Sequence, residues 1–337
     1  MRRFLALILA AALLLPGCSA GQTESHQAVY LDVFDTVTTV TAVGMGEEDF
    51  QQAAEKIHET LLHYHRLFDI YNDYEGLNNL KTVNDNAGLS PVCVDGDMIR
   101  LLLDCRDYYA LTDHAVNVAM GSVLKIWHDV RAAALEAPEK AVLPTDAALR
   151  EAAQHCGWDT VRIDEAASTV YLTDPTQSLD VGAVAKGWAA GKAAQQAPSG
   201  FLISVGGNVC ATGPKDDDTP WVVGIADPDG GEGYLSTLYD RDKAIVTSGD
   251  YQRYFELDGV RYHHIIDPET LYPAARFRSV TVVCDDSGLA DALSTALFVL
   301  PLEEGEALAR KAGAEAMWLD IQGNFSETPG FADYRAE

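Results

Sequence analysis

Basic residues are scarce in this chain of 337 residues. Lys and Arg number 24 against 51 Asp and Glu, so the formal net charge is −27. Proteins that bind nucleic acid need clustered Lys and Arg to contact phosphates, so this composition disfavours nucleic acid as a partner. Net charge of this size favours solubility and carries no information about the fold.

Common cofactor and metal motifs are also missing. The sequence contains neither GxGxxG nor GxxxxGK[ST], which excludes the usual nucleotide-binding folds. Beyond Cys18 there is no CxxC pair, and the other cysteines are scattered: Cys93, Cys105, Cys156, Cys210 and Cys284. An odd number at such spacings is neither a disulfide framework nor a zinc site. We therefore expect these cysteines to be small buried apolar side chains.

Long apolar runs are absent after the first residues. The run from Phe4 to Leu15 follows two arginines and is shorter than the roughly 20 residues of a membrane-spanning helix, so it fits a signal peptide. It ends in Leu-Pro-Gly-Cys, which resembles the bacterial lipoprotein box. We predict a lipoprotein signal peptide over residues 1–17, a lipidated Cys18 and a tether over residues 18–29. The alternative is an ordinary cleaved signal with an incidental cysteine. Either way the protein is exported, and lipidation would anchor it to the membrane on the extracytoplasmic face.

The remaining sequence mixes helical and strand patterns. It is 47% hydrophobic, which is enough for a substantial core. Apolar residues at helical spacing alternate with Val- and Thr-rich segments, so the order of elements predicts an α+β fold in one domain over residues 30–330. We expect helices near 47–71, 94–112, 143–155, 182–197 and 289–313, with a loop at 72–88 and an Ala- and Glu-rich connection before residue 143. We expect a hairpin at 160–174 and strands at 28–44, 200–207, 221–228, 235–240, 243–250, 252–267 and 278–286.

One pair of oxygen-bearing side chains suits a metal. Asp291 and Thr295 are four residues apart in GLADALSTAL, so on a helix they share a face. A carboxylate and a hydroxyl in this arrangement suit a hard cation such as Mg²⁺. The alternative, with Asp291 in an N-terminal turn and Thr295 in ordinary packing, remains open on the residues alone.

Two adjacent histidines provide a candidate base. His263 and His264 lie in a strand pattern, so they face opposite sides and only one can face a given cleft. Histidine can act as a general base because its ordinary pKa is near neutrality. The alternatives are an exposed strand residue for His263 and a hydrogen-bonded core histidine for His264.

Small residues mark two further positions. Lys186 stands in SLDVGAVAKGWAAGKA, where close packing places its cation either toward solvent or against an anion, and we favour the anion. Gly206 and Gly207 follow a strand pattern. Such a pair is either a plain turn or a close approach of backbone to a ligand.

Taken in order, these segments resemble the ApbE family, the exported FAD:protein FMN transferases. The resemblance runs from about residue 30 to 325 through FDTVTT, FDIYNDYEGLNNL, AVNVAMGSVLKIWHD, LDVGAVAKGWA, LISVGGNVCATG, WVVGIADP, AIVTSGDYQRYFELDGVRYHHIIDP and SVTVVCDDSGLADALSTALF. It implies a T-fold-like α+β domain with an antiparallel sheet and packed helices. It also implies a reaction in which Mg²⁺ assists transfer of FMN from FAD to a threonine hydroxyl of an acceptor redox protein, with release of AMP.

The resemblance also assigns site residues. The metal ligands it implies are the backbone carbonyl of Ala183, Asp291 and Thr295, with Ser294 nearby, and His264 corresponds to the base. The flavin contacts that it implies are Phe34, Tyr71, Ala115, Val116, Asn117, Asp180, Lys186 and the strand around His264.

The chain departs from the family pattern at three places. Phe34-Asp35-Thr36 replaces the frequent Met-Gly-Thr, Val116-Asn117 replaces Phe-Asp, and Leu271 replaces a glycine. Two other activities remain compatible with the same residues. One is an FAD pyrophosphatase that yields FMN and AMP, and the other is a flavin-binding lipoprotein without catalysis.

Overall fold

The computed structural model describes residues 24–215, 218–231 and 233–336. The predicted signal peptide and Cys18 lie outside these residues. Along the described chain, no helix combines the length and the apolar character that a membrane crossing requires.

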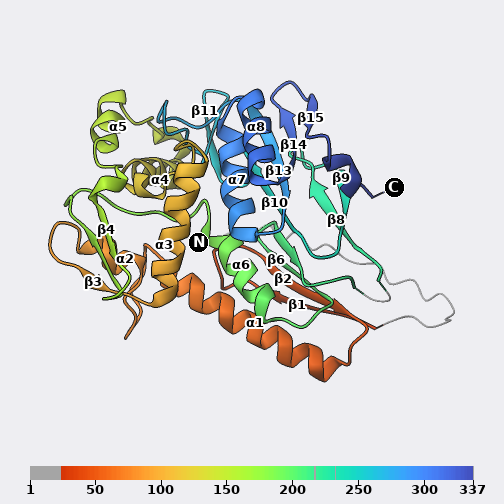
Figure 1. Ribbon diagram of the computed structural model, residues 1–337. Coiled ribbons are helices and arrows are strands. Elements are labelled where there is room, and N and C mark those ends of the chain that lie inside the picture. Colours follow the sequence, from red (N-terminus) through yellow and green to blue (C-terminus); the bar gives the residue numbers. More distant parts are fainter. Residues whose placement is uncertain (1–23, 216–217, 232, 337) are drawn as a thin grey trace.

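An eight-stranded sheet forms the centre of the molecule (Figure 1). Every neighbouring pair is antiparallel, in the order β1-β2-β6-β7-β10-β13-β14-β15. The strands are β1 (Ser25–Tyr30), β2 (Thr38–Val43), β6 (Phe201–Val205), β7 (Asn208–Ala211), β10 (Ala244–Gly249), β13 (Phe277–Cys284), β14 (Glu315–Asp320) and β15 (Phe325–Glu327). In β13 nearly every residue is buried, because both faces of the sheet are covered at its centre.

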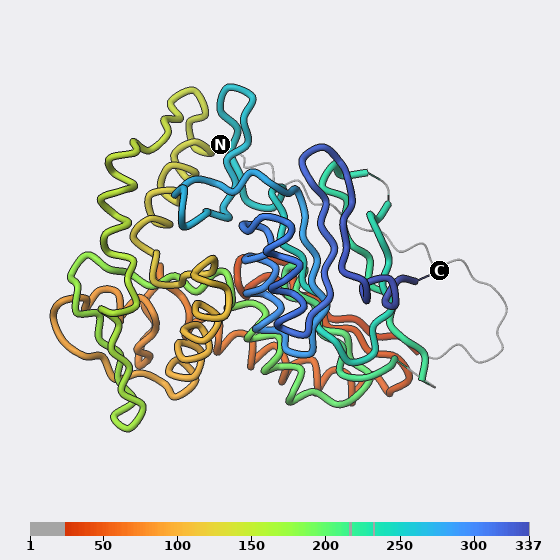
Figure 2. The backbone as a smooth tube through the Cα atoms, turned by 45° about the horizontal axis from the view of Figure 1, so that its top comes forward, coloured from red at the N-terminus to blue at the C-terminus, as the bar shows by residue number. Residues whose placement is uncertain are grey.

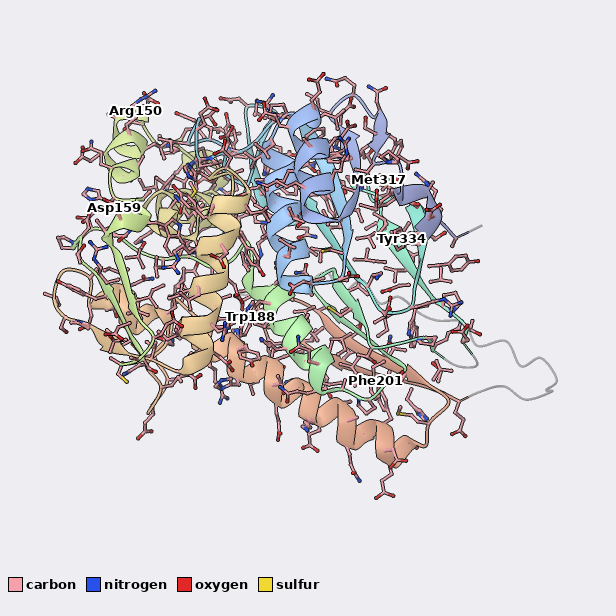
Figure 3. The ribbon with its side chains drawn as sticks, viewed as in Figure 1. Arg150, Asp159, Trp188, Phe201, Met317 and Tyr334 are labelled. Atoms are coloured by element: carbon pink, nitrogen blue, oxygen red, sulfur yellow. The ribbon has the colours of Figure 1, made fainter. Side chains whose placement is uncertain are left out.

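Helices cover one face of this sheet (Figure 1). They are α1 (Glu47–Phe68), α6 (Ala185–Gln196), α7 (Ser287–Val299) and α8 (Leu302–Ala312). Helix α1 begins with three acidic residues, which favour a helix N-terminus, and buries an apolar stripe that starts with Phe50, Ala54 and Ile57. Trp188 of α6 lies beside α1, with Tyr64 and Phe68 edge-on to its ring (Figure 3).

A two-stranded ribbon packs on the other face. Strands β8 (Trp221–Ala226) and β9 (Tyr234–Asp240) pair with each other. Their inward side chains form a second cluster with residues of the sheet and with Phe331 of the short helix η4 (Phe331–Tyr334). The sheet is therefore the middle layer of three, and any site on it must lie at an edge or between helices.

Residues between α1 and α6 form a lobe on one side of the sheet, as Figures 1 and 2 show. Its elements are α2 (Leu80–Asp85), β3 (Val92–Cys93), α3 (Gly96–Leu111), η1 (Val118–Met120), α4 (Gly121–Glu136), η2 (Pro138–Lys140), α5 (Asp146–Ala153), η3 (Trp158–Thr160), β4 (Val161–Asp164) and β5 (Thr169–Leu172). The hairpin of β11 (Tyr254–Leu257) and β12 (Val260–His263) reaches this lobe. There Tyr262 stacks on Trp127 of α4 with ring centroids 6.0 Å apart.

The α+β fold is confirmed, but several elements differ from the sequence prediction. The strand predicted over 28–44 is two strands, β1 and β2, because Phe34 and Asp35 turn the chain with φ values of 53° and 52°. The strand predicted over 252–267 is the β11–β12 hairpin, which turns at Asp258-Gly259 with positive φ at both residues. Helix α4 was predicted as a connection and α2 as a loop.

The cysteines agree with the prediction in part. Cys105, Cys210 and Cys284 are buried and Cys156 is half-buried, whereas Cys93 is exposed, and all of them are free thiols. Gly206 and Gly207 form the two-residue turn between β6 and β7, both with positive φ. The predicted turn is therefore present, and the side chain of Thr36 approaches Gly206 closely.

Candidate active site

Helices α6 and α7 cross at very short range, and Asp291 lies at the crossing. Its side chain is 3% exposed, and its Oδ2 accepts a 2.8 Å hydrogen bond from the backbone N–H of Gly187. The ammonium of Lys186 is 3.7 Å from the same oxygen. A Cβ on Gly187 would lie 2.3 Å from the carbonyl oxygen of Ser287, so only glycine permits this crossing. The small residues around Lys186 thus serve to place a cation beside a buried carboxylate.

The same contact changes the hydrogen bonding of the backbone at the start of α6. The N–H of Trp188 donates to Val184 in the usual helical manner. The N–H of Gly187 instead donates to Asp291, so the carbonyl of Ala183 lacks its usual donor from the next turn. A backbone carbonyl in this state has lone pairs available for another partner.

Thr295 and Ser294 differ in how free their hydroxyl groups are to bind a ligand. Thr295 is half-buried one turn after Asp291, on the same face of α7. Ser294 is fully buried; its hydroxyl donates to the carbonyl of Asp291 at 2.9 Å and bonds the hydroxyl of Ser248 at 2.8 Å. The helix begins at Ser287 and is capped by Asp286, so the alternative that placed Asp291 in the first turn is wrong.

The two histidines have opposite environments. His263 is buried, donates from Nε2 to the carbonyl of Ala274 at 2.7 Å, and accepts at Nδ1 from the N–H of Ile265 at 3.2 Å. It is a satisfied core histidine, so the exposed-residue alternative for His263 is wrong. His264 follows directly after β12 and is half-buried, and its Nδ1 is enclosed without a hydrogen-bond partner among the described residues.

Burial, together with the charges of the neighbouring Arg253, His263, Lys186 and Arg131, lowers the pKa of His264 to about 3. The imidazole is therefore neutral at physiological pH and can accept a proton. His264 therefore shares its surroundings with three cationic side chains, one of which is the predicted Lys186.

The N-terminal turn joins this region. The backbone N–H of Phe34 donates to Nδ1 of His65 at 3.1 Å, and the guanidinium of Arg253 donates to the carbonyl of Phe34 at 3.3 Å. The left-handed φ values at Phe34 and Asp35 suit the glycine of the family's Met-Gly-Thr pattern, and aspartate tolerates that conformation better than most residues. For the bulky Phe34 the conformation is strained, as is common at functional sites.

The other predicted flavin contacts lie where the lobe meets the sheet. Tyr71 stacks on His128 with ring centroids 5.0 Å apart, and its hydroxyl is 3.2 Å from His128 Nδ1. The backbone of Asp180 donates to the carbonyl of Val118 at 2.8 Å, which fixes Asp180 beside η1. Burial raises the pKa of Asp180, while an amide hydrogen bond from Gly182 and nearby cations oppose that rise.

The run from Ala115 to Asn117 has a structural role in addition to the predicted one. Ala115 and Val116 are buried. The side chain of Asn117 accepts from the N–H of Ala119 at 3.0 Å and donates to the carbonyl of Cys156 at 3.0 Å. Both ends of this amide are occupied, and the backbone N–H groups of Ala115 and Val116 donate to Thr112. The flavin contacts at these positions remain a prediction.

Leu271 occupies a position with φ of 65°, a conformation that suits the glycine of the family pattern. Its carbonyl accepts a 2.8 Å hydrogen bond from Nε1 of Trp127, and its side chain joins the apolar cluster between α4 and the hairpin. This departure from the family pattern is therefore accommodated by packing and does not touch the candidate reactive groups.

Sequence reasoning missed three side chains of this region. His128 and Arg131 lie on α4, which was predicted as a connection, so their shared face could not be recognised. Arg253 lies in the quoted segment QRYFELDGVRYHH, but the strand prediction gave no reason to place it near Phe34. A helical interpretation of GSVLKIWHDVRAAALE would have indicated the first two.

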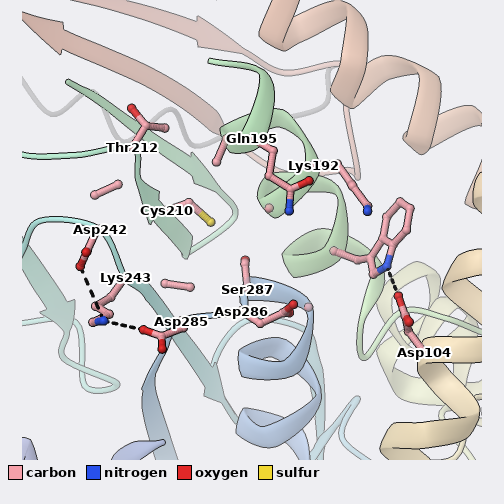
Figure 4. Close-up of a pocket in the computed structure, with 16 residues that line it drawn as sticks. Asp104, Lys192, Gln195, Cys210, Thr212, Asp242, Lys243, Asp285, Asp286 and Ser287 are labelled. Carbon is pink, nitrogen blue, oxygen red and sulfur yellow. Dashed lines mark hydrogen bonds and ion pairs between the residues drawn. The ribbon is translucent and has the colours of Figure 1, made fainter. Parts of the chain in front are cut away.

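A separate cavity of about 280 Å³ lies between the C-terminal half of α6 and the N-terminus of α7 (Figure 4). Cys210 and Ser287 line it, and Lys243 pairs there with Asp242 and Asp285. None of the predicted site residues lines this cavity, so it is distinct from the candidate active site.

One further group of potential metal ligands lies elsewhere in the described chain. His63, Asp95 and Asp97 bring three potential ligand atoms within 4.8 Å of one another. Two of these residues are exposed, and Asp97 accepts a hydrogen bond from the hydroxyl of Tyr64 at 2.9 Å. Exposed acidic groups of this kind occur without metal, and this group includes none of the predicted ligands.

Comparisons with known proteins agree with this fold. The family model described as "ApbE family" matches residues 34–318. An FAD:protein FMN transferase of Treponema pallidum (strain Nichols) is 36% identical over 274 residues, covering 75% of this chain and 74% of the relative. One from Klebsiella pneumoniae (strain 342) is 32% identical and covers 73% and 78%. The crystal structure of the ApbE protein from Thermotoga maritima superposes with a TM-score of 0.82 at 29% identity, covering 94% of this chain and 100% of that one.

The antiparallel sheet with its helical layer is the α+β fold of these relatives, which are named transferases. The chain belongs to the ApbE family.

Proposed function

We propose that this protein is a Mg²⁺-dependent enzyme that transfers FMN from FAD to a threonine hydroxyl of an acceptor protein and releases AMP. The observation that carries the proposal is the buried carboxylate of Asp291 between α6 and α7, with the Lys186 ammonium 3.7 Å away. The relatives named FAD:protein FMN transferase support the assignment of substrate and product.

The oxygen atoms near this crossing fit a hard cation. Asp291, the hydroxyl of Thr295 and the carbonyl of Ala183 would hold Mg²⁺, since one carboxylate and two neutral oxygens are ligands this ion accepts. When bound, the ion would neutralise the diphosphate of FAD and polarise its phosphorus atoms. The hydroxyl of Ser294 donates to the backbone carbonyl of Asp291 and bonds the hydroxyl of Ser248. Ser294 therefore helps to hold Asp291 in position.

Lys186 and His264 perform the remaining chemistry. Lys186 steadies a phosphate oxygen as a point charge. The threonine oxygen of the acceptor attacks the FMN-side phosphorus, its proton passes to His264, and the bond from that phosphorus to the bridging oxygen breaks, so AMP leaves with that oxygen. A diphosphate bound beside Arg253 and Lys186 offsets the charges that lower the pKa of His264, which makes the imidazole a stronger base when substrate is present.

The decisive experiment incubates the purified protein with FAD, MgCl₂ and a candidate redox subunit and measures the mass of that subunit. An increase by the mass of an FMN group is expected. Asp291→Ala should abolish it, and His264→Ala should slow it by about 10²–10⁴-fold. Asp146→Ala, which removes an exposed carboxylate on α5, is the matched control and should leave transfer unchanged.

Four results would contradict the proposal. Undiminished transfer by Asp291→Ala would refute Asp291 as a metal ligand. Undiminished transfer by His264→Ala would refute His264 as the general base. FMN and AMP formed equally with and without acceptor would indicate a pyrophosphatase, whereas FAD that stays intact would indicate a binding protein alone.

We also propose that the enzyme works outside the cytoplasm, anchored through a lipid on Cys18. The support is the sequence of residues 1–18, in which the cysteine stands where the apolar run ends. Cys18→Ala, expressed in a bacterium that processes lipoproteins, should move the protein from the detergent phase to the aqueous phase in a phase-partition assay. A wild-type protein that is already in the aqueous phase would refute the anchor.

A further inference from the structure

The connection between β1 and β2 is held by an imidazole. Phe34 and Asp35 both have left-handed φ values, 53° and 52°, although neither is glycine. The backbone N–H of Phe34 donates to Nδ1 of His65 on α1 at 3.1 Å, and the rings of these two residues meet edge to face with centroids 5.7 Å apart. Residues other than glycine keep such a conformation only where the surrounding fold imposes it, and His65 is one source of that constraint.

This contact fixes the protonation state of His65. Because a backbone N–H can only donate, Nδ1 carries no proton, and the neutral ring has its proton on Nε2. A second proton would go to Nδ1 and would turn the acceptor into a donor. Two donors would then face each other, so the hydrogen bond to Phe34 exists only while the imidazole of His65 is neutral.

The carbonyl side of Phe34 connects the turn to the candidate base. Nη2 of Arg253 donates to the carbonyl of Phe34 at 3.3 Å. Strand β11 begins at Tyr254, whose register partner in β12 is His263. Arg253 precedes that pair and His264 follows it, so the two residues occupy facing positions at the open end of the hairpin. The peptide groups of Phe34 are therefore held between α1 and the hairpin that carries His264.

The charged groups around the contact act on His65 in opposite directions. Asp32 of the same connection accepts from Nε2 of His58 at 2.9 Å. Burial raises the pKa of Asp32, but the hydrogen bond from His58 and the charges of His58 and His65 outweigh that effect and lower it. Asp32 therefore favours a proton on His65, whereas the cation of Arg253 disfavours it. Asp35, in the turn itself, is exposed.

We propose that His65 is a positioning residue for FAD binding. Its neutral imidazole, together with Arg253, holds the backbone of Phe34 in the conformation that places this predicted flavin contact beside the hairpin. The inference rests on the proposed function and deepens it, because it adds a residue outside the predicted set and makes the affinity for FAD depend on the protonation of that residue. Acid pH weakens FAD binding through the loss of this single hydrogen bond.

The first test measures FAD binding by flavin fluorescence, so it does not depend on transfer. His65→Leu removes the acceptor, and FAD affinity at about pH 8 should fall roughly tenfold, as expected for one lost hydrogen bond. His65→Asn places an amide oxygen near the position of Nδ1 and should keep an affinity close to that of the wild type.

The second test is the pH profile of the same binding. The affinity of the wild type should fall from about pH 8 to about pH 5, the range in which histidines ordinarily change charge. An amide oxygen cannot be protonated in this range, so His65→Asn should lose clearly less affinity. A side chain that only supported the fold would not make the two profiles differ.

Hydrogen–deuterium exchange tests the contact itself, without any ligand. The peptide that contains Phe34 should exchange faster in His65→Leu than in the wild type and His65→Asn, all compared at one pH. If His65→Leu does not fold, the wild type and His65→Asn still supply the comparison of pH profiles.

His58→Asn is the matched control. His58 lies on the same helix and bonds Asp32 of the same connection, but it does not supply the acceptor for Phe34. This variant should show the affinity and the pH profile of the wild type.

Two results would overturn the role of His65: wild-type FAD affinity in His65→Leu at about pH 8, or parallel pH profiles for the wild type and His65→Asn. A protein that shows the expected affinities but transfers no FMN would refute the proposed transferase function and leave the positioning role intact.

Discussion

His263 and His264 show how much two adjacent residues can differ. Both ring nitrogens of His263 are hydrogen-bonded within the fold, whereas Nδ1 of His264 is enclosed and finds no partner in the part of the chain that the structure describes. The strand pattern predicted that they face opposite sides, but it could not decide which faces the core, because the partners of His263 include the distant carbonyl of Ala274.

This difference predicts a pH dependence of stability. The pKa of His264 is about 3 in the folded protein and near 6.5 in an unfolded chain. Below about pH 6.5 the unfolded state therefore binds a proton that the folded state does not, and the free energy of unfolding falls as the pH falls. Between pH 6.5 and 5, urea unfolding should show that the wild type loses roughly 1–2 kcal/mol more than His264→Gln.

The control for this measurement is His63→Gln, which replaces an exposed histidine on α1. It should follow the wild type at every pH. Parallel curves for the wild type and His264→Gln would mean that His264 titrates like an ordinary histidine.

Single site residues were predictable where the chemistry follows from spacing. The i, i+4 relation of Asp291 and Thr295 on α7 needs only a correct helix. The availability of the Ala183 carbonyl could not be derived in this way, because it depends on Gly187 donating to a residue 104 positions away. The resemblance implied Ala183, and the structure shows that its carbonyl has lost the usual donor, Gly187.

At the scale of elements, the crossing of α6 and α7 controls the site. Gly187→Ala should lower the free energy of unfolding by about 1–3 kcal/mol, because the new Cβ would lie 2.3 Å from the Ser287 carbonyl and 2.5 Å from Cβ of Asp291. The forced separation should also displace Asp291 and reduce FMN transfer. Thermal or urea unfolding and the mass assay measure the two effects.

Gly191→Ala is the matched control in the same helix. Its Cβ would meet only Cβ of Ser287 at 3.3 Å, and alanine favours a helix over glycine by up to about 1 kcal/mol. We expect stability equal to the wild type or slightly higher. If Gly187→Ala behaved in the same way, the close crossing would not constrain the site.

Elements were predictable where periodicity is strong and their ends carry ordinary signals. Helix α1 has an acidic first turn and an apolar stripe, and the sequence predicted it closely. The turn at Phe34-Asp35 lacks glycine and proline, so nothing marked the break between β1 and β2. Helix α4 was missed because its Ala- and Glu-rich end looked like a linker.

At the scale of the whole molecule, the class of fold was predictable and its topology was not. Alternating patterns predicted strands and helices in one α+β domain, and the structure agrees. The order β1-β2-β6-β7-β10-β13-β14-β15 joins strands that are distant in sequence, as do the contacts that bring Arg253 to Phe34. Such pairings depend on the packing of the complete core, and no local pattern encodes them.

The turn at Phe34 lies near the beginning of the described chain, and Thr295 lies near its end. The carbonyl of Phe34 receives the guanidinium of Arg253, while Asp291 receives the amide of Gly187. A nascent fragment that stops short of residue 295 lacks Thr295 and therefore cannot contain all the candidate site residues. Synthesis must therefore be nearly complete before these groups, which come from opposite ends of the described chain, can meet.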